Sequence, residues 1–278
     1  MLEQLARVSR LVRLRHLLKL IRHPREEIVA FKYHYRRVPE RAFVAFLAGI
    51  PPGEMATIDR VYADLRQHAT RFGALTARLA VHPDGFGGQM MSEYSAIYAL
   101  IRLLRPASVV ETGVADGTTS AYILQALEDN GRGHLYSIDL PSERLPPGTA
   151  PGWIVDGSLR HRWTLRIGAS SQLLAPLLNE LGSIDVFLHD SLHTYDNMLF
   201  EYRAAWPFLH GDGLFLSHDV GRNAAFFDFA REVGMRWSDW RVYEVLGGFR
   251  ARGARHQSRD RSRRAQWSTS SARLVNHT

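Results

Sequence analysis

Hydrophobic and polar residues alternate along this chain in two periods, one typical of helices and the other typical of strands. Apolar residues spaced three or four apart predict helices over 2–22, 39–50, 55–80, 91–105, 172–181 and 196–209, with a further helical pattern from Tyr122 to Leu127. Short apolar runs predict strands at 108–110, 134–139, 163–167, 184–190, 214–217 and 240–245. From residue 108 onward strands and helices alternate, which predicts a doubly wound, mostly parallel α/β sheet.

The same pattern divides the chain into three parts. We expect residues 1–88 to form a helical extension or cap, 89–253 to form the sheet domain, and 254–278 to form a disordered tail that is rich in Arg, Ser and Gln. Gly247 and Gly248, which follow the last predicted strand, indicate a hairpin at an antiparallel edge. The stretch 141–157 is rich in Pro and Gly and lacks a period, so we expect a long, mobile connection there.

Charge is concentrated at the two ends of the chain. The 278 residues carry a net charge of +7, of which residues 1–25 contribute +6 and residues 253–278 contribute +5, which leaves −4 for the body between them. A nucleic-acid partner would therefore concern the ends only, and we favour a solvated tail over a specific nucleic-acid contact. The basic amphipathic segment 2–22 would suit an anionic membrane surface, but it lacks Trp and Phe anchors, so we favour packing on its own domain or on a partner subunit.

Composition excludes several kinds of chemistry. The chain has no cysteine, so disulfides, a thiol nucleophile and Cys-bound zinc are absent.

No uncharged apolar run approaches the length of about 20 residues that a membrane helix needs, and arginines interrupt any signal-peptide pattern near the start. We therefore expect a cytoplasmic protein.

The first predicted strand runs into a glycine-containing turn. Glu111, Gly113 and Gly117 follow the pattern E-x-G-x-x-x-G, and a helix follows. Ligands bind beside such a turn, where the strands of a doubly wound sheet end. The spacing differs from the dinucleotide pattern G-x-G-x-x-G, and the acids Glu111 and Asp116 would repel phosphate but suit a cationic ligand.

Three further strands end in acids. Asp139 lies 22 positions after Gly117, a spacing that suits hydrogen bonds to ribose hydroxyls. Asp190 and Asp219 end two strands that we expect to be neighbours, so their carboxylates would meet at one edge of the sheet, where they would suit Mg²⁺. His193 lies on the loop after Asp190 and could act as a general base, since an unperturbed histidine has a pKa of about 6.5. Alternatively, the two strand-end acids could bind no metal, Asp190 could cap the next helix, and His193 could be a structural histidine.

These motifs resemble those of class I S-adenosylmethionine (SAM) dependent methyltransferases. The pattern D-x-x-x-x-D-x-x-H-x-Y, followed by G-x-G-x-x-x-x-H-D, resembles the group that includes macrocin, mycinamicin and rhamnosyl O-methyltransferases and the cephalosporin hydroxylase-like proteins. The resemblance covers roughly residues 90–250. It implies a Rossmann-like sheet of seven strands with an antiparallel edge hairpin, and a homo-oligomer.

The resemblance also implies roles for individual residues. Asp190 and Asp219 would hold Mg²⁺, with His218 beside the second ligand, and His193 would be the base. The residues expected to bind the cofactor are Met91, Ser92, Glu111, Gly113, Gly117, Thr118, Ser120, Asp139 and Ser170. Ala169 stands where the group often has an Asp that contacts adenine, so that contact would have to come from Ser170, the backbone or elsewhere.

Three functions fit these features. The first is a SAM-dependent, Mg²⁺-assisted O-methyltransferase that acts on a hydroxyl of a small molecule or glycoside. The second is a nicotinamide-dependent oxidoreductase, which the glycine spacing disfavours. The third is a non-catalytic module of the same fold, held at a membrane or nucleic acid by its basic ends; the intact set of Asp190, His193 and Asp219 disfavours it.

Overall fold

The computed structural model of the chain describes residues 24–82 and 93–251. The helix predicted over 2–22, the tail from 254, the boundary at residues 88 and 89, and the expected cofactor residues Met91 and Ser92 all lie outside the described residues. In the described part, no helix is long and apolar enough to cross a membrane.

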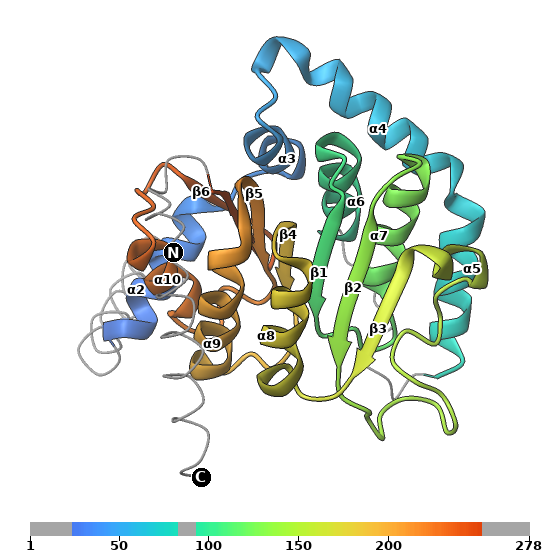
Figure 1. Ribbon diagram of the computed structural model, residues 1–278. Helices are drawn as coiled ribbons and strands as arrows, with labels where there is room; N and C mark the ends of the chain where they lie inside the picture. Colours follow the sequence, from blue (N-terminus) through green and yellow to red (C-terminus); the bar gives the residue numbers. More distant parts are fainter. Residues whose placement is uncertain (1–23, 83–92, 252–278) are drawn as a thin grey trace, which may run out of the picture.

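The core of the fold is a seven-stranded sheet with the order β3-β2-β1-β4-β5-β7-β6 (Figure 1). The first five strands in this order are parallel, while β7 runs antiparallel to both β5 and β6. The strands are β1 (Ser108–Thr112), β2 (His134–Asp139), β3 (Trp163–Ile167), β4 (Ile184–His189), β5 (Leu209–Ser217), β6 (Trp240–Tyr243) and β7 (Leu246–Arg250). The structure thus confirms the doubly wound α/β class and the antiparallel edge hairpin.

Helices cover both faces of this sheet because its central strands are apolar on both sides. Val109 and Val110 of β1 are both fully buried, but they belong to separate apolar clusters on opposite faces, as alternation along a strand requires. The first cluster contains residues of α3 (Glu40–Ala48), α4 (Met55–Gln67), α5 (Ala69–Ala80), α6 (Glu93–Leu104) and α7 (Thr118–Asp129). The second contains residues of α2 (Pro24–Arg36), α8 (Ser170–Leu181), α9 (Tyr195–Ala205) and α10 (Ala225–Glu232).

The single helix expected over 55–80 is two helices. The chain turns at His68, which has non-helical backbone angles and joins α4 to α5. The Nε2 atom of His68 lies 2.9 Å from Asp129 Oδ2 on α7, so a contact distant in sequence fixes this break. Short 3₁₀ turns complete the chain: η1 (Pro52–Glu54), η2 (Gly157–Arg162) and η3 (Trp206–Phe208).

The edge hairpin turns before the two glycines, not at them. Glu244 has a positive φ of 47° between β6 and β7, and Gly247 and Gly248 lie within β7 itself. A Cβ on Gly248 would lie 2.7 Å from Leu216 Cδ2 and 2.9 Å from Leu47 Cδ1. These glycines therefore allow close packing of the strand and not a turn.

Candidate functional site

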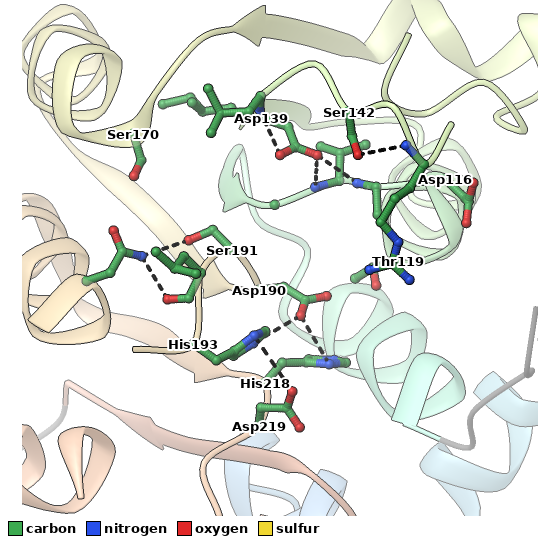
Figure 2. A pocket seen from close by; sticks show the side chains of 18 of the residues that line it. Asp116, Thr119, Asp139, Ser142, Ser170, Asp190, Ser191, His193, His218 and Asp219 are labelled. Atoms are coloured by element: carbon green, nitrogen blue, oxygen red, sulfur yellow. Dashed lines mark hydrogen bonds and ion pairs between the residues drawn. The ribbon is translucent and has the colours of Figure 1, made fainter. Parts of the chain in front are cut away.

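A cavity of about 960 Å³ opens at the carboxyl ends of the parallel strands (Figure 2). The loops that follow β1, β2, β3, β4 and β5 all contribute lining residues. Of the residues singled out in the sequence, those that line the cavity are Gly113, Asp116, Thr118, Asp139, Ala169, Ser170, Asp190, His193, His218 and Asp219. Glu111, Gly117 and Ser120 do not line it.

Gly113 brings the first loop of the cavity against the fourth. Its φ is +84°, and a Cβ placed there would lie 2.1 Å from the backbone oxygen of Asp190. Only glycine allows both this conformation and this approach. Glycine is therefore required here by the neighbouring backbone of Asp190. From the sequence, a ligand beside the turn had been the expected neighbour.

Gly117 likewise allows a close approach, here of the connection between β2 and β3 to the glycine turn. Its φ is +101°, and a Cβ would lie 2.6 Å from Cα of Gly152. The backbone N–H of Gly152 donates to Ala115 O at 2.9 Å. The 141–157 connection, expected to be a mobile loop, therefore packs against the glycine turn.

Asp139 holds the glycine turn in place. Its Oδ2 accepts hydrogen bonds from the backbone N–H groups of Val114, at 2.9 Å, and Ala115, at 2.8 Å. Its Oδ1 accepts from the backbone N–H of Leu140 at 2.8 Å. The carboxylate is already fixed beside the cavity, in a position where a ligand's hydroxyls could reach it. The sequence did not indicate these backbone contacts.

Glu111 does not face the cavity. It is fully buried, and its Oε2 accepts hydrogen bonds from Ser120 Oγ at 2.6 Å and Ser137 Oγ at 2.7 Å. Burial raises the pKa of Glu111 to about 8, although the two serine hydroxyls oppose the shift. At neutral pH the group is therefore mostly uncharged, and the repulsion of phosphate that the sequence suggested at Glu111 does not arise. Asp116 does line the cavity, where its Oδ1 accepts from Trp153 Nε1 at 2.7 Å.

Two acids and two histidines meet at the other end of the cavity, as Figure 2 shows. His193 lies between the acids, with Nε2 3.5 Å from Asp190 Oδ1 and Nδ1 3.7 Å from Asp219 Oδ2. His218 Nδ1 also lies 3.5 Å from Asp190 Oδ1. The Nε2 atoms of both histidines are buried and have no hydrogen-bond partner within the described part of the chain. We call Asp190, His193, His218 and Asp219 the acid–histidine cluster.

The acid–histidine cluster has the chemistry of a divalent-cation site but not the geometry of an assembled one. Carboxylate oxygens are preferred ligands for Mg²⁺, and imidazole suits several other divalent ions. Across residues 24–82 and 93–251, however, no group of three or more His, Cys, Asp or Glu is placed to hold a metal ion. The Nε atom of Arg222 lies 2.8 Å from Asp219 Oδ2 and partly neutralises that carboxylate.

Four residues of this region escaped the sequence-based reasoning. Arg222 follows Asp219 by three positions, a spacing that could have suggested the ion pair. Asn197 and Glu201 lie four apart on the predicted helix after His193, so their shared face could have been noticed. Glu93 lies at the start of α6, within electrostatic reach of His218 and Asp190, and is 1 % exposed. Burial raises its pKa. No local signal indicated that Glu93 would lie there.

Comparison with known proteins gives one family. Residues 110–220 match the family model described as a methyltransferase domain. No curated protein matches the chain.

Solved structures with a similar fold include three methyltransferases. The O-methyltransferase TomG from Streptomyces achromogenes, in complex with SAM, is 15% identical, with 64% of this chain and 86% of that chain covered and a TM-score of 0.47. The methyltransferase PaMTH1 from Podospora anserina, bound to SAH, is 15% identical, with 81% and 86% covered and a TM-score of 0.43. MycE, from the mycinamycin biosynthetic pathway, in complex with Mg, SAH and mycinamycin VI, is 15% identical, with 67% and 56% covered and a TM-score of 0.43.

The matched segment starts within β1 and ends just after Asp219, so it includes the glycine turn, Asp139 and the acid–histidine cluster. These elements surround one cavity at the edge where ligands bind in this class of sheet. Residues 110–220 therefore match a methyltransferase domain, and this segment carries the glycine turn and the acid–histidine cluster at one edge of a doubly wound sheet.

Proposed function

We propose that this chain transfers the methyl group of SAM to a hydroxyl of a small molecule or glycoside, with help from a divalent cation. The observation that carries the proposal is the position of His193, between two carboxylates and on the wall of the cavity that the glycine turn also lines. A location in the cytoplasm and assembly into a homo-oligomer remain predictions from the sequence.

The methyl donor would lie along the glycine turn. Gly113 and Thr118 offer backbone and hydroxyl contacts, Asp139 offers a carboxylate for ribose hydroxyls, and Ser170 lies on the side where adenine would sit. Three residues would support this turn from the side away from the cavity and would not touch the donor: Glu111, Gly117 and Ser120. Met91 and Ser92 stay predictions from the resemblance.

His193 would supply the base for the reaction. When bound, SAM supplies an electrophilic methyl carbon on its sulfonium. The acceptor hydroxyl would lose its proton to the imidazole of His193, and the acceptor oxygen would bond to the methyl carbon as the carbon–sulfur bond breaks and its electron pair moves to sulfur. The products are a methyl ether, S-adenosylhomocysteine and a protonated His193, whose charge the nearby carboxylates of Asp190 and Asp219 stabilise.

Asp190 and Asp219, with His218 beside them, would hold the cation. Mg²⁺ bound there would lower the pKa of a coordinated hydroxyl and orient the acceptor. Because Arg222 contacts Asp219 in this structure, its guanidinium must move when a cation takes that carboxylate.

Replacement of the base tests the proposal. We expect His193→Ala and Asp190→Asn each to reduce methyl transfer to a panel of glycosides and catechols by about 100-fold or more, while SAM affinity by calorimetry stays unchanged. Full activity in both variants would remove these residues from the mechanism. Calorimetry with NADH and NADPH is the control, and binding of either in place of SAM would favour an oxidoreductase.

Removal of the metal tests the cation separately. We expect EDTA to abolish methyl transfer and added Mg²⁺ to restore it. We also expect Arg222→Gln to bind Mn²⁺ more tightly than the unaltered protein in an electron paramagnetic resonance titration, because a competing guanidinium is gone. An enzyme that keeps full activity in EDTA would assign Asp190 and Asp219 to roles without metal.

A further inference from the structure

A fully buried carboxylate lies behind the acid–histidine cluster. Glu201 of α9 has no exposed surface. Its Oε2 accepts hydrogen bonds from Thr112 Oγ1 at 2.5 Å and His189 Nδ1 at 2.6 Å. Its Oε1 accepts from Ser191 Oγ at 2.7 Å and Asn197 Nδ2 at 3.3 Å.

The donors to Glu201 flank the residues that form the site. Thr112 directly precedes Gly113, while His189 and Ser191 stand on either side of Asp190. The backbone adds a parallel link, because Asp190 N–H donates to Thr112 O at 2.8 Å. One carboxylate on α9 therefore connects the end of β1, where the glycine turn begins, to the end of β4, where the loop with His193 begins.

The His189 ring transmits this anchoring to the base. Since a carboxylate accepts, Nδ1 of His189 carries the proton in this bond. The His189 and His193 rings pack edge to face, with centroids 5.3 Å apart and an interplanar angle of 78°. On the other side, Asn223 Nδ2 donates to His193 O at 3.1 Å. The base is thus fixed by a buried ring whose own orientation depends on Glu201.

The hydrogen bonds keep Glu201 charged despite its burial. Burial raises the pKa of Glu201, but the hydrogen bond and charge interaction with His189, together with the hydrogen bond from Thr112, outweigh this effect and hold the pKa below its ordinary value. A buried charged network contributes little net stability compared with apolar residues of similar volume, so stability alone gives a weak reason for an acid at this place.

We propose that Glu201 is a positioning residue for methyl transfer: through His189 and Ser191 it sets the orientation of His193 and Asp190 relative to the glycine turn. This inference rests on the proposed roles of His193 and Asp190. Glu201 touches neither the donor nor the acceptor, because it does not line the cavity.

Steady-state kinetics of four single variants and one double variant test this role. We expect Glu201→Gln to lower kcat by about 10- to 100-fold, with SAM affinity within about twofold of the unaltered protein. His189→Asn, which can keep the donor to Glu201 but lacks the ring that contacts His193, should show a similar loss. Tyr202→Phe is the matched control, since it removes a buried hydrogen bond of 2.6 Å to Ser217 from the same helix, and it should keep kcat within about twofold.

The double variant His193→Ala/Glu201→Gln separates positioning from general damage. If Glu201 acts through His193 and Asp190, Glu201→Gln slows His193→Ala by less than it slows the unaltered protein, since only the contribution through Asp190 is left. Equal losses in Glu201→Gln and Tyr202→Phe, or additive losses in the double variant, would overturn the proposal. If Glu201→Gln does not fold, Ser191→Ala replaces it with the same expectations. Full activity in His193→Ala would instead defeat the proposed base, so the two failures are distinguishable.

A second observation concerns the outer face of α2. Four large apolar side chains are exposed there: Ile28 by 48%, Phe31 by 62%, Tyr35 by 67% and the neighbouring Trp237 by 40%. The spacing of residues 28, 31 and 35 places them on one face of the helix. Phe31 stacks on Tyr35 with ring centroids 5.6 Å apart, and Tyr35 lies 5.9 Å from Trp237. We call these four residues the aromatic face.

Two basic side chains of α2 lie near the aromatic face in the sequence or in space. The Arg36 guanidinium lies 5.5 Å from the centroid of the Trp237 ring, and Lys32 lies on the same helix. In sequence, residues 1–37 carry ten Lys or Arg against three Glu, a net charge of +7. A second copy of this chain would bring like charges together across a two-fold interface, whereas an anionic bilayer supplies the opposite charge and an interface that Tyr and Trp favour.

We infer that the aromatic face docks on an anionic lipid surface. Sedimentation of the full chain with vesicles tests this inference. We expect binding to phosphatidylcholine vesicles only when phosphatidylserine is included, with weakening at high salt.

The double substitution Phe31→Ser/Tyr35→Ser should weaken vesicle binding by about tenfold. Val81→Ser, at an apolar side chain that is 81% exposed on another helix end, is the control and should bind as the unaltered chain does. Binding that ignores phosphatidylserine, no binding at all, or a dimer in light scattering that the double substitution dissociates would each overturn the inference.

Discussion

Two fully buried glutamates beside this site have pKa values shifted in opposite directions, and their hydrogen-bond donors explain why. Glu111 accepts from two serine hydroxyls, and burial raises its pKa to about 8. Glu201 accepts from more donors, one of them an imidazole, and its pKa falls. At the residue scale, burial alone therefore does not decide whether an acid near the cofactor edge is charged; the donors around it do.

The raised pKa of Glu111 predicts a pH dependence of stability. Since the folded state holds this proton up to about pH 8 and an unfolded Glu loses it near its ordinary pKa of 4.5, stability falls as pH rises between these values, by at most about 1.4 kcal/mol per pH unit. Glu111→Gln keeps the side-chain shape without the proton equilibrium. We expect its melting temperature to depend less on pH than that of the unaltered protein between pH 5 and 8. Parallel melting curves for both proteins across this range would contradict the raised pKa.

At the scale of elements, the glycine turn after β1 is joined to the loop after β4 by direct backbone contact. A Cβ on Gly113 would overlap the backbone of Asp190, and its φ is positive. Gly131 is a matched control, because its φ is +64° but a Cβ there would meet nothing within 4 Å.

We expect Gly113→Ala to destabilise the fold by several kcal/mol and to abolish SAM binding, because it adds a clash with Asp190 to the strain at positive φ. Gly131→Ala carries only the strain, about 1 kcal/mol, and should bind SAM normally. Chemical denaturation and calorimetry measure both effects. If the two variants lose equal stability and keep SAM binding, the contact between these loops contributes neither to the stability of the fold nor to SAM binding.

Periodicity predicted the elements that local pattern determines. The bounds of β2 and β3 agree with the prediction, because each is a short apolar run between turn residues. The break at His68 and the short helix α10 were missed. The first depends on a partner on another helix, and the second is an eight-residue segment for which no helix was predicted.

The sequence predicted the site residues that lie at the ends of strands. It did not predict those whose position depends on packing between elements distant in the chain. Asp139, Asp190, His193 and Asp219 follow strands, so topology alone brings them to one edge. The sequence pattern places Glu111 next to the glycine turn, but it does not show that the side chain points away from the cavity into the core. The connection of Glu201 to both strand ends needs the register of α9 against the sheet, which sequence spacing does not give.

At the scale of the whole molecule, two apolar layers leave one polar edge. Helices bury both faces of the sheet, so the carboxyl ends of β1, β2, β4 and β5 are where charged side chains gather around a large cavity. The aromatic face lies on α2, which packs beside β6 at the antiparallel side of the sheet. The proposed docking side therefore lies on a helix whose Tyr33 packs against Gly221, two residues after Asp219.

Nuclear magnetic resonance of SAM labelled with ¹³C at its methyl group, with Mn²⁺ in place of Mg²⁺, tests most directly whether methyl donor, cation and base share this edge. We predict that bound Mn²⁺ strongly broadens the methyl signal of bound SAM, and that Asp219→Asn abolishes the broadening while SAM still binds. A methyl signal that Mn²⁺ leaves sharp, or broadening that persists in Asp219→Asn, would contradict the account.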